Sequence, residues 1–84
     1  MNTDNPEQQI RAALYSVAPD LEGEALAADV RYRDQFEFDS MDFLRFVIEL
    51  HRRTGIEIAE SDYPRLETLA AGVAFLREKA RPAG

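Results

Sequence analysis

Ser40 has the clearest chemical potential in the chain because it stands among carboxylates at the start of a long amphipathic stretch. Asp39 is a good helix N-cap, and Asp42 can reach back to it as in a capping box. Ser40 would then lie in the first helical turn with a free hydroxyl, beside unpaired backbone N–H groups. A phosphate attached there would be stabilised. The simpler alternative is that Asp39 and Ser40 only begin a helix.

Other site chemistries are disfavoured by the residues available. Ser40 and His51 are eleven residues apart on one predicted helix, which separates their backbones by about 16 Å and prevents a shared hydrogen bond. His51 is the only histidine and there is no cysteine, so we expect neither a zinc site nor a cysteine nucleophile. We interpret Asp39 and Asp42 as capping groups rather than metal ligands. No nucleophile, base and orienting group come together, and we expect no enzyme.

The elements that must position Ser40 follow from helical periodicity. Apolar spacing predicts three main helices and one short helix, over about Pro6–Val17, Ser40–Arg53, Ala59–Tyr63 and Thr68–Lys79. Gly55 suits the left-handed position that ends the longest helix, and Pro64 should end the short one. The predicted fold is therefore all-α, a four-helix bundle with a long first loop.

That first loop, residues 18–39, has an irregular pattern. Its spaced apolar residues could fix it to a core, and they are Val30, Tyr32, Phe36 and Phe38. Long loops without secondary structure are usually functional or disordered, and the spaced aromatics favour an ordered, functional loop.

Apolar residues on the helix that begins at Ser40 fall on two faces. The wider face suits a core and consists of Phe43, Phe46, Val47 and Leu50. The second face lies beside Ser40 and consists of Met41, Leu44 and Ile48. This second stripe could line a cavity or contact a partner; alternatively, the segment after Gly55 covers it.

Length and composition predict one globular domain, residues 1–84, with an ordered core over about 6–80. Ten Lys and Arg against sixteen Asp and Glu give a net charge of −6, which repels nucleic acid and favours basic partner surfaces. Residues 1–9 are polar and predict neither a signal peptide nor a membrane span. We expect a soluble, cytoplasmic monomer.

Four segments in register resemble the acyl carrier protein family. They are Asp39–Met41, Gly55–Ile58, Leu66–Leu69 and Val73–Leu76. The resemblance is close from about Phe36 to Leu76 and looser over the first helix. An Asp-Ser-Met tripeptide alone is weak evidence, but the same tripeptide followed by the turn, Thr68 and the last helix is strong.

The resemblance implies a four-helix bundle in which a phosphopantetheinyl transferase modifies Ser40 with 4'-phosphopantetheine from coenzyme A. The thiol of this arm would hold acyl groups as thioesters, so a cysteine-free protein would carry cargo between acyl-loading and acyl-processing enzymes. The surface that these partners read would be Met41, Asp42, Leu44, Arg45 and Ile48. Candidates for lining an acyl cavity are Phe43, Leu44, Phe46, Val47 and Leu69, and the bulk of the two phenylalanines favours a short or polar cargo.

Two departures from the family pattern bear on the pathway. Glu37 stands where the family commonly has a glycine. The helix that begins at Ser40 is also net positive, because Arg45, Arg52 and Arg53 outweigh Asp42 and Glu49. Enzymes that expect an acidic surface should bind this helix poorly. We therefore expect a specialised lipid, polyketide or amino-acid-loading pathway before general fatty acid synthesis.

Two alternatives remain open on the sequence. A peptidyl or aminoacyl carrier shares the fold and the serine and differs only in its cargo. An unmodified, carrier-like helical scaffold would only bind partners, although it would have no use for a free serine at this turn.

Overall fold

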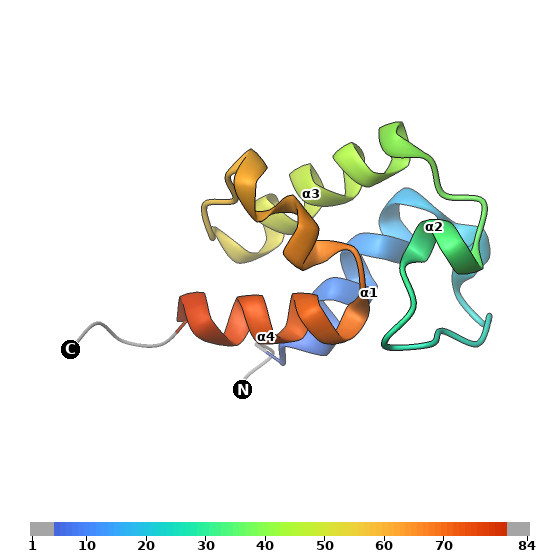
Figure 1. Cartoon of the computed structure of the whole chain (residues 1–84), viewed down its shortest axis with the longest axis horizontal. Helices are drawn as coiled ribbons and strands as arrows, with labels where there is room; N and C mark the ends of the chain where they lie inside the picture. Colours follow the sequence, from blue (N-terminus) through green and yellow to red (C-terminus); the bar gives the residue numbers. More distant parts are fainter. Residues whose placement is uncertain (1–4, 81–84) are drawn as a thin grey trace.

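The computed structural model describes residues 5–80, in which helices are joined by irregular segments and no strand is present. Figure 1 shows their arrangement. In chain order the elements are α1 (Pro6–Val17), η1 (Pro19–Leu21), α2 (Tyr32–Gln35), α3 (Ser40–Thr54), η2 (Glu60–Leu66) and α4 (Leu69–Ala80), where η denotes a 3-10 helix. The predicted all-α fold is confirmed, with the three main helices close to their expected positions.

Local capping sets the start of the first and last helices. The side chain of Asn5 accepts hydrogen bonds from the backbone N–H groups of Glu7 and Gln8, and Pro6 occupies the first helical position of α1. Thr68 accepts from the N–H of Ala71 at 3.1 Å. The expected start of α4 at Thr68 is therefore one residue early, because Thr68 is a capping residue.

Three local interactions stabilise the C-terminal end of α3. Gly55 has φ 72°, in the left-handed region, and donates its N–H to the carbonyl of His51. The hydroxyl of Thr54 donates to the carbonyl of Leu50 at 2.8 Å. Nδ1 of His51 lies 2.8 Å from the carbonyl oxygen of Ile56. His51 is exposed, as expected, but it also ties the helix end to the next segment.

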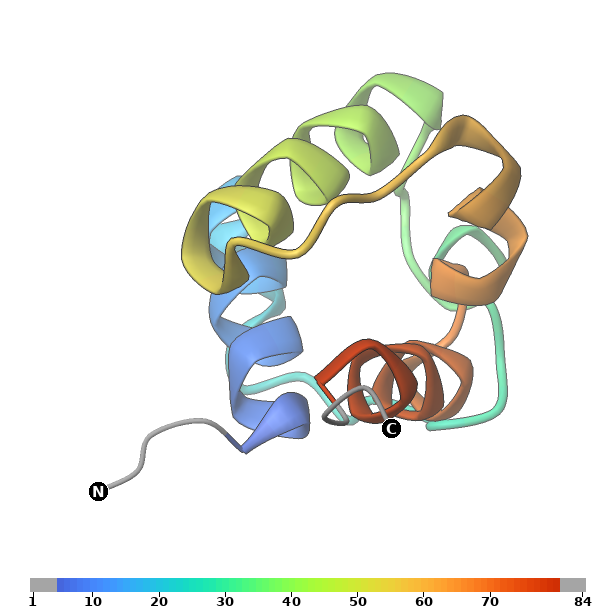
Figure 2. The same cartoon turned by 90° about the vertical axis from the view of Figure 1, so that its left-hand side faces the viewer.

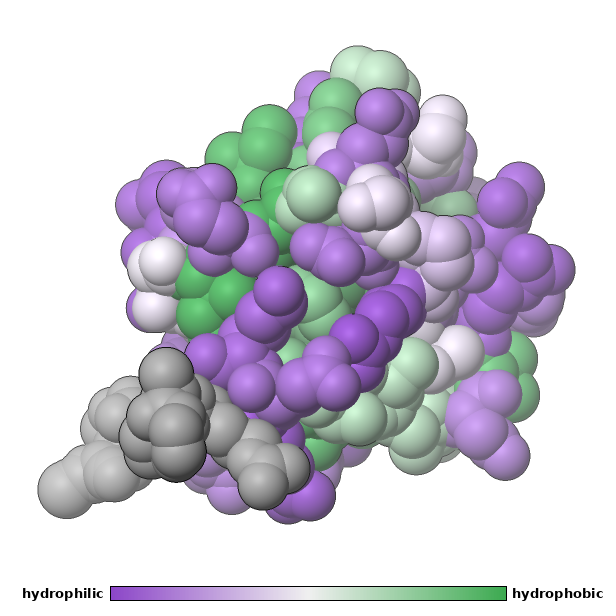
Figure 3. Space-filling model, turned by 60° about the vertical axis from the view of Figure 1, so that its left-hand side comes forward, coloured by the Kyte–Doolittle hydropathy of each residue, from purple (hydrophilic) through white to green (hydrophobic). Residues whose placement is uncertain are grey.

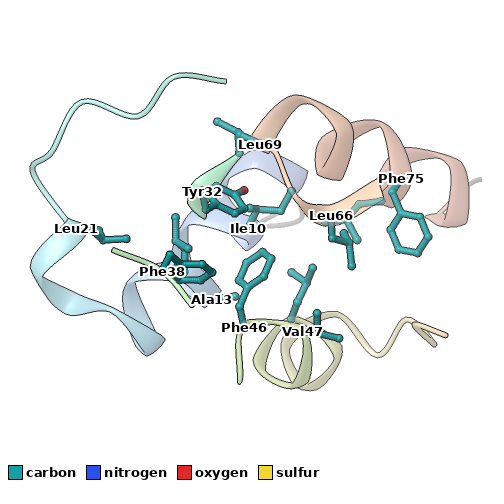
Figure 4. Close-up of a cluster of buried hydrophobic side chains, with 13 residues drawn as sticks. Ile10, Ala13, Leu21, Tyr32, Phe38, Phe46, Val47, Leu66, Leu69 and Phe75 are labelled. Carbon is teal, nitrogen blue, oxygen red and sulfur yellow. The ribbon is translucent and has the colours of Figure 1, made fainter. Parts of the chain in front are cut away.

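The core is a single cluster that α1, α3 and α4 share with the first loop and η2. Figure 2 shows these elements arranged around a centre, and Figure 4 shows the side chains that fill it. The buried apolar residues are Ile10, Ala13, Leu14, Leu21, Tyr32, Phe38, Phe46, Val47, Leu50, Leu66, Leu69, Phe75 and Leu76. Tyr32, Phe38 and Phe46 meet edge to face, with ring centroids 5.6 to 6.4 Å apart.

The first loop is more regular than its sequence pattern indicates. It contains η1 and α2, and the expectation of an irregular segment is wrong for those residues. Tyr32, 1 % exposed, anchors α2 in the core, and its backbone N–H donates to the carbonyl of Glu67. Ala70 donates in the same way to Ala28. These contacts with the segment around the start of α4 are long-range, so local sequence does not reveal them.

The short helix also differs from its prediction. The expected turn Ala59–Tyr63 was to end at Pro64, yet η2 continues through Pro64 to Leu66. Proline breaks a helix by removing one N–H and by crowding the preceding turn. Leu66 is only 1 % exposed, and its burial holds this segment against α4. The core contact therefore outweighs the local proline signal.

Candidate functional site

Ser40 is the first residue of α3 and is exposed. The capping box predicted before it is present. Oδ1 of Asp39 accepts from the N–H of Asp42 at 2.9 Å, and Oδ2 of Asp42 accepts from the N–H of Asp39 at 3.2 Å. The reciprocal bonds satisfy the helix start without the serine side chain. The hydroxyl of Ser40 is therefore not needed as a cap, as predicted, and it has no hydrogen-bond partner among residues 5–80.

Backbone donors lie beside this hydroxyl. The helical ladder begins with the N–H of Phe43, which donates to the carbonyl of Asp39 at 2.9 Å. The N–H groups of Ser40 and Met41 precede the ladder and have no acceptor within residues 5–80. They lie at the positive end of the helix dipole, where an anion is stabilised.

An open groove of about 210 Å³ adjoins Ser40. Its walls come from α2, the start of α3, η2 and the segment before α4. The lining residues are Arg31, Tyr32, Arg33, Phe38, Asp39, Ser40, Phe43, Tyr63 and Glu67. The rings of Phe43 and Tyr63 meet edge to face, with centroids 5.6 Å apart. The groove thus offers aromatic side chains and charged groups beside one nucleophilic hydroxyl.

Only one of the five predicted cavity residues, Phe43, borders this groove. Phe46, Val47 and Leu69 are buried in the core, and Leu44 faces outward. Apart from Ser40, the other groove residues come from α2, η2 and the segments before α3 and α4, which sequence spacing does not bring together. Leu44 lies outside this groove, and its role in lining an acyl cavity stays a prediction.

The second apolar stripe of α3 is exposed. Met41, Leu44 and Ile48 have exposed fractions of 58 %, 42 % and 55 %. Apolar surface is visible among polar residues on the upper part of the face in Figure 3. The segment after Gly55 packs against the core through Ile56 and does not cover the stripe. The alternative in which that segment covers it is therefore wrong.

The positive charge predicted for this helix is more localised than a residue count indicates. Glu49 pairs with both Arg52, at 3.6 Å, and Arg53, at 2.9 Å. Arg45 has no ion-pair partner in the part of the chain that the structure describes. Glu49 can neutralise only one of these two arginines, so α3 keeps the expected net positive charge, and beside the exposed stripe Arg45 is a guanidinium without an ion pair among residues 5–80.

Within residues 5–80, no three His, Asp or Glu side chains are grouped so that they could hold a metal ion. No helix in the same range is long and apolar enough to cross a membrane.

A helical bundle that presents a free serine hydroxyl beside an apolar groove is the arrangement of a carrier domain. Residues 8–76 match the family described as phosphopantetheine attachment site, and the chain belongs to this family. No solved structure matches the chain significantly.

Family membership confirms the predicted resemblance and the predicted cofactor, 4'-phosphopantetheine, which these domains hold covalently. It also supports the role of a phosphopantetheine carrier. Carrier domains of this kind are typically non-catalytic and interact with modifying and acyl-processing enzymes.

The residues around Ser40 fit a phosphate ester. The hydroxyl is exposed and takes no part in capping, while two backbone N–H groups beside it lack acceptors within the described range. The carboxylates of Asp39 and Asp42 accept from each other's backbone. Both therefore help to hold the helix start.

Proposed function

We propose that Ser40 is the residue that carries the phosphopantetheine arm of an acyl carrier protein. The chain has three serines, Ser16, Ser40 and Ser61. Ser16 lies near the end of α1 and Ser61 lies within η2, and neither borders the groove. The observation that carries the proposal is the exposed hydroxyl of Ser40 at the head of α3, beside unpaired N–H donors.

In this role the chain supplies a nucleophile and a binding surface. The hydroxyl of Ser40 attacks the phosphorus of coenzyme A that bears the pantetheine, the pyrophosphate bond breaks and 3',5'-ADP leaves. The transferase provides the magnesium and the base that accepts the proton of the serine. The capping box leaves the hydroxyl unused at the helix start, and Ser40 is exposed. When bound, the arm supplies a thiol that holds acyl groups as thioesters.

Intact mass measures the attachment directly. The folded chain is incubated with coenzyme A, magnesium and a broad-specificity phosphopantetheinyl transferase. We expect a gain of one phosphopantetheine in the wild type and in Ser61→Ala, and no gain in Ser40→Ala. Because Asp39 caps the helix, Ser40→Ala should keep its circular dichroism spectrum. A folded wild type that gains no mass would favour the unmodified scaffold.

We also propose that one carrier domain spans residues 1–84 and that partner enzymes contact the exposed side of α3. Support comes from the exposed stripe and the charge beside it. The residues of this surface are Met41, Asp42, Leu44, Arg45 and Ile48. Ile48→Ser should raise the KM of the transferase for the carrier without unfolding it. An unchanged KM for both Ile48→Ser and Leu44→Ser would mean that the exposed stripe of α3 does not contact the transferase.

The pathway that we propose is a specialised one, because the free cation on this surface is Arg45. Like charges across an interface disfavour binding. Enzymes with basic docking sites should therefore bind this carrier poorly, because Arg45 lies on the surface that they contact. Arg45→Glu should improve use of the carrier by such enzymes, whereas Arg77→Glu, which makes the same charge change on α4, should not. Equal use of the wild type and a housekeeping carrier by fatty-acid enzymes would contradict this proposal.

The groove supports a short or polar cargo. Its volume is about 210 Å³. For comparison, a cavity of about 150 Å³ holds a benzene molecule, so the groove has room for a group only slightly larger. We expect a short acyl group on the arm to perturb the proton NMR signals of Phe43 and Tyr63, and a long acyl group to leave most of its chain in solvent. Stronger protection of a long acyl thioester than of a short one from hydrolysis would refute this size preference.

A further inference from the structure

Arg33 is an exposed cation that lines the same groove as Ser40. It also lines the neighbouring depression, together with Phe38 and Asp39, which lead into Ser40. No ion-pair partner of Arg33 lies among residues 5–80. By contrast, Arg31 on the groove wall is paired with Asp34 at 2.9 Å. Arg33 is therefore the groove guanidinium that is available to an incoming anion.

The backbone that carries Arg33 is held in place. Tyr32 is buried and donates its N–H to the carbonyl of Glu67 at 3.1 Å. At the other end of α2, the Gln35 amide accepts from the N–H of Ala27 and donates to the carbonyls of Ala27 and Val30, at 2.8 to 2.9 Å. These bonds fix the position from which the Arg33 side chain extends.

The surroundings of Ser40 make a cation useful there. Three carboxylates line the depression that Arg33 shares, namely those of Glu37, Asp39 and Asp42. Without a cation, they would oppose a phosphodiester on Ser40, which carries a negative charge. The guanidinium group presents a fork of N–H donors that suits phosphate oxygens.

We propose that Arg33 binds the phosphodiester of the arm and holds the base of the arm at the groove. This inference depends on the proposed attachment at Ser40. The N–H groups of Ser40 and Met41 supply further donors on the side of α3. Arg33 acts here as a positioning residue, because the thiol chemistry takes place at the far end of the arm.

Proton–nitrogen NMR of the arginine side chains tests the contact without any activity assay. The wild type is first converted to the modified form and checked by mass. We expect the Arg33 Nε–H signal to shift on modification and to return toward its unmodified position in about 1 M salt, where the screening length is about 3 Å. The Arg45 Nε–H signal, on the exposed side of α3, should not move.

Phosphorus NMR of modified variants gives the second measurement. The phosphodiester signal should move in Arg33→Gln and remain unchanged in Arg77→Gln, the matched control on α4. If the wild type is modified but the Arg33 signal stays in place and Arg33→Gln leaves the phosphorus signal unchanged, the inference is wrong while the attachment site stands. If Ser40 gains no arm at all, the proposed function fails and this inference fails with it.

Discussion

Replacing Tyr32 with phenylalanine should stabilise the fold at neutral pH. The hydroxyl of Tyr32 is buried and has no hydrogen-bond partner among the described residues. A buried polar group left in this state costs about 1–3 kcal/mol. Phenylalanine keeps the ring contacts with Phe38 and Phe46. Removal of the oxygen leaves a small void, which offsets part of this gain. We therefore expect the free energy of unfolding to rise by about 1 kcal/mol, the lower limit of that range.

The same substitution should change the alkaline pH dependence. Burial raises the pKa of the Tyr32 phenol above its ordinary value. Above about pH 10, the unfolded chain loses this proton while the folded chain keeps it. The folded state then binds more protons, and the free energy of unfolding falls by up to about 1.4 kcal/mol per pH unit. Tyr32→Phe lacks this loss, so its advantage should reach about 2 kcal/mol at pH 11.

Urea unfolding followed by far-ultraviolet circular dichroism, between about pH 7 and pH 11, measures both effects. Tyr63→Phe serves as the control, since Tyr63 is half-buried on the groove wall. We expect it to lie within about 0.5 kcal/mol of the wild type at neutral pH. A loss of 1 kcal/mol or more for Tyr32→Phe at neutral pH would refute the reasoning, because the hydroxyl would then have a partner such as a bound water. An unchanged alkaline slope would refute the pKa argument.

Three further predictions concern the fold around the site and use the same unfolding assay. Asp39→Ala should lower the free energy of unfolding by about 1 kcal/mol, because it removes the cap of α3; no loss would mean that another group caps the helix. Phe46→Ala should cost about 3–5 kcal/mol, whereas Leu44→Ala, on the exposed stripe, should cost less than about 0.5 kcal/mol; similar losses would contradict the two faces of α3. A Cβ on Gly72 would lie 2.9 Å from Cδ1 of Ile10, so Gly72→Ala should be better tolerated with Ile10→Val, with a coupling of about 0.5–1 kcal/mol; additive effects would mean that the Ile10 side chain moves aside freely.

Local signals in the sequence were sufficient to predict where the main helices lie. The capping pair Asp39 and Asp42 predicted the start of α3, and Gly55 predicted its end. Each signal acts between residues a few positions apart, so the chain needs no tertiary contact to express it. The free hydroxyl of Ser40 belongs to this class, because capping by Asp39 leaves the serine side chain unused.

The misjudged elements depend on distant contacts. α2 exists because Tyr32 is buried against α3 and the segment before α4, and η2 passes Pro64 because Leu66 enters the core. Residue counting cannot show which side chains meet.

The sequence by itself determined the all-α class, the main helices and a serine, not needed for capping, at the head of the longest one, since all three depend on periodicity and capping within a few residues. Only the tertiary structure decided what surrounds that serine. The groove brings Arg33 of α2 and Tyr63 of η2 to Phe43 of α3, residues separated by long stretches of chain. Their meeting depends on how the helices pack around the shared core, and that packing is a property of the whole fold.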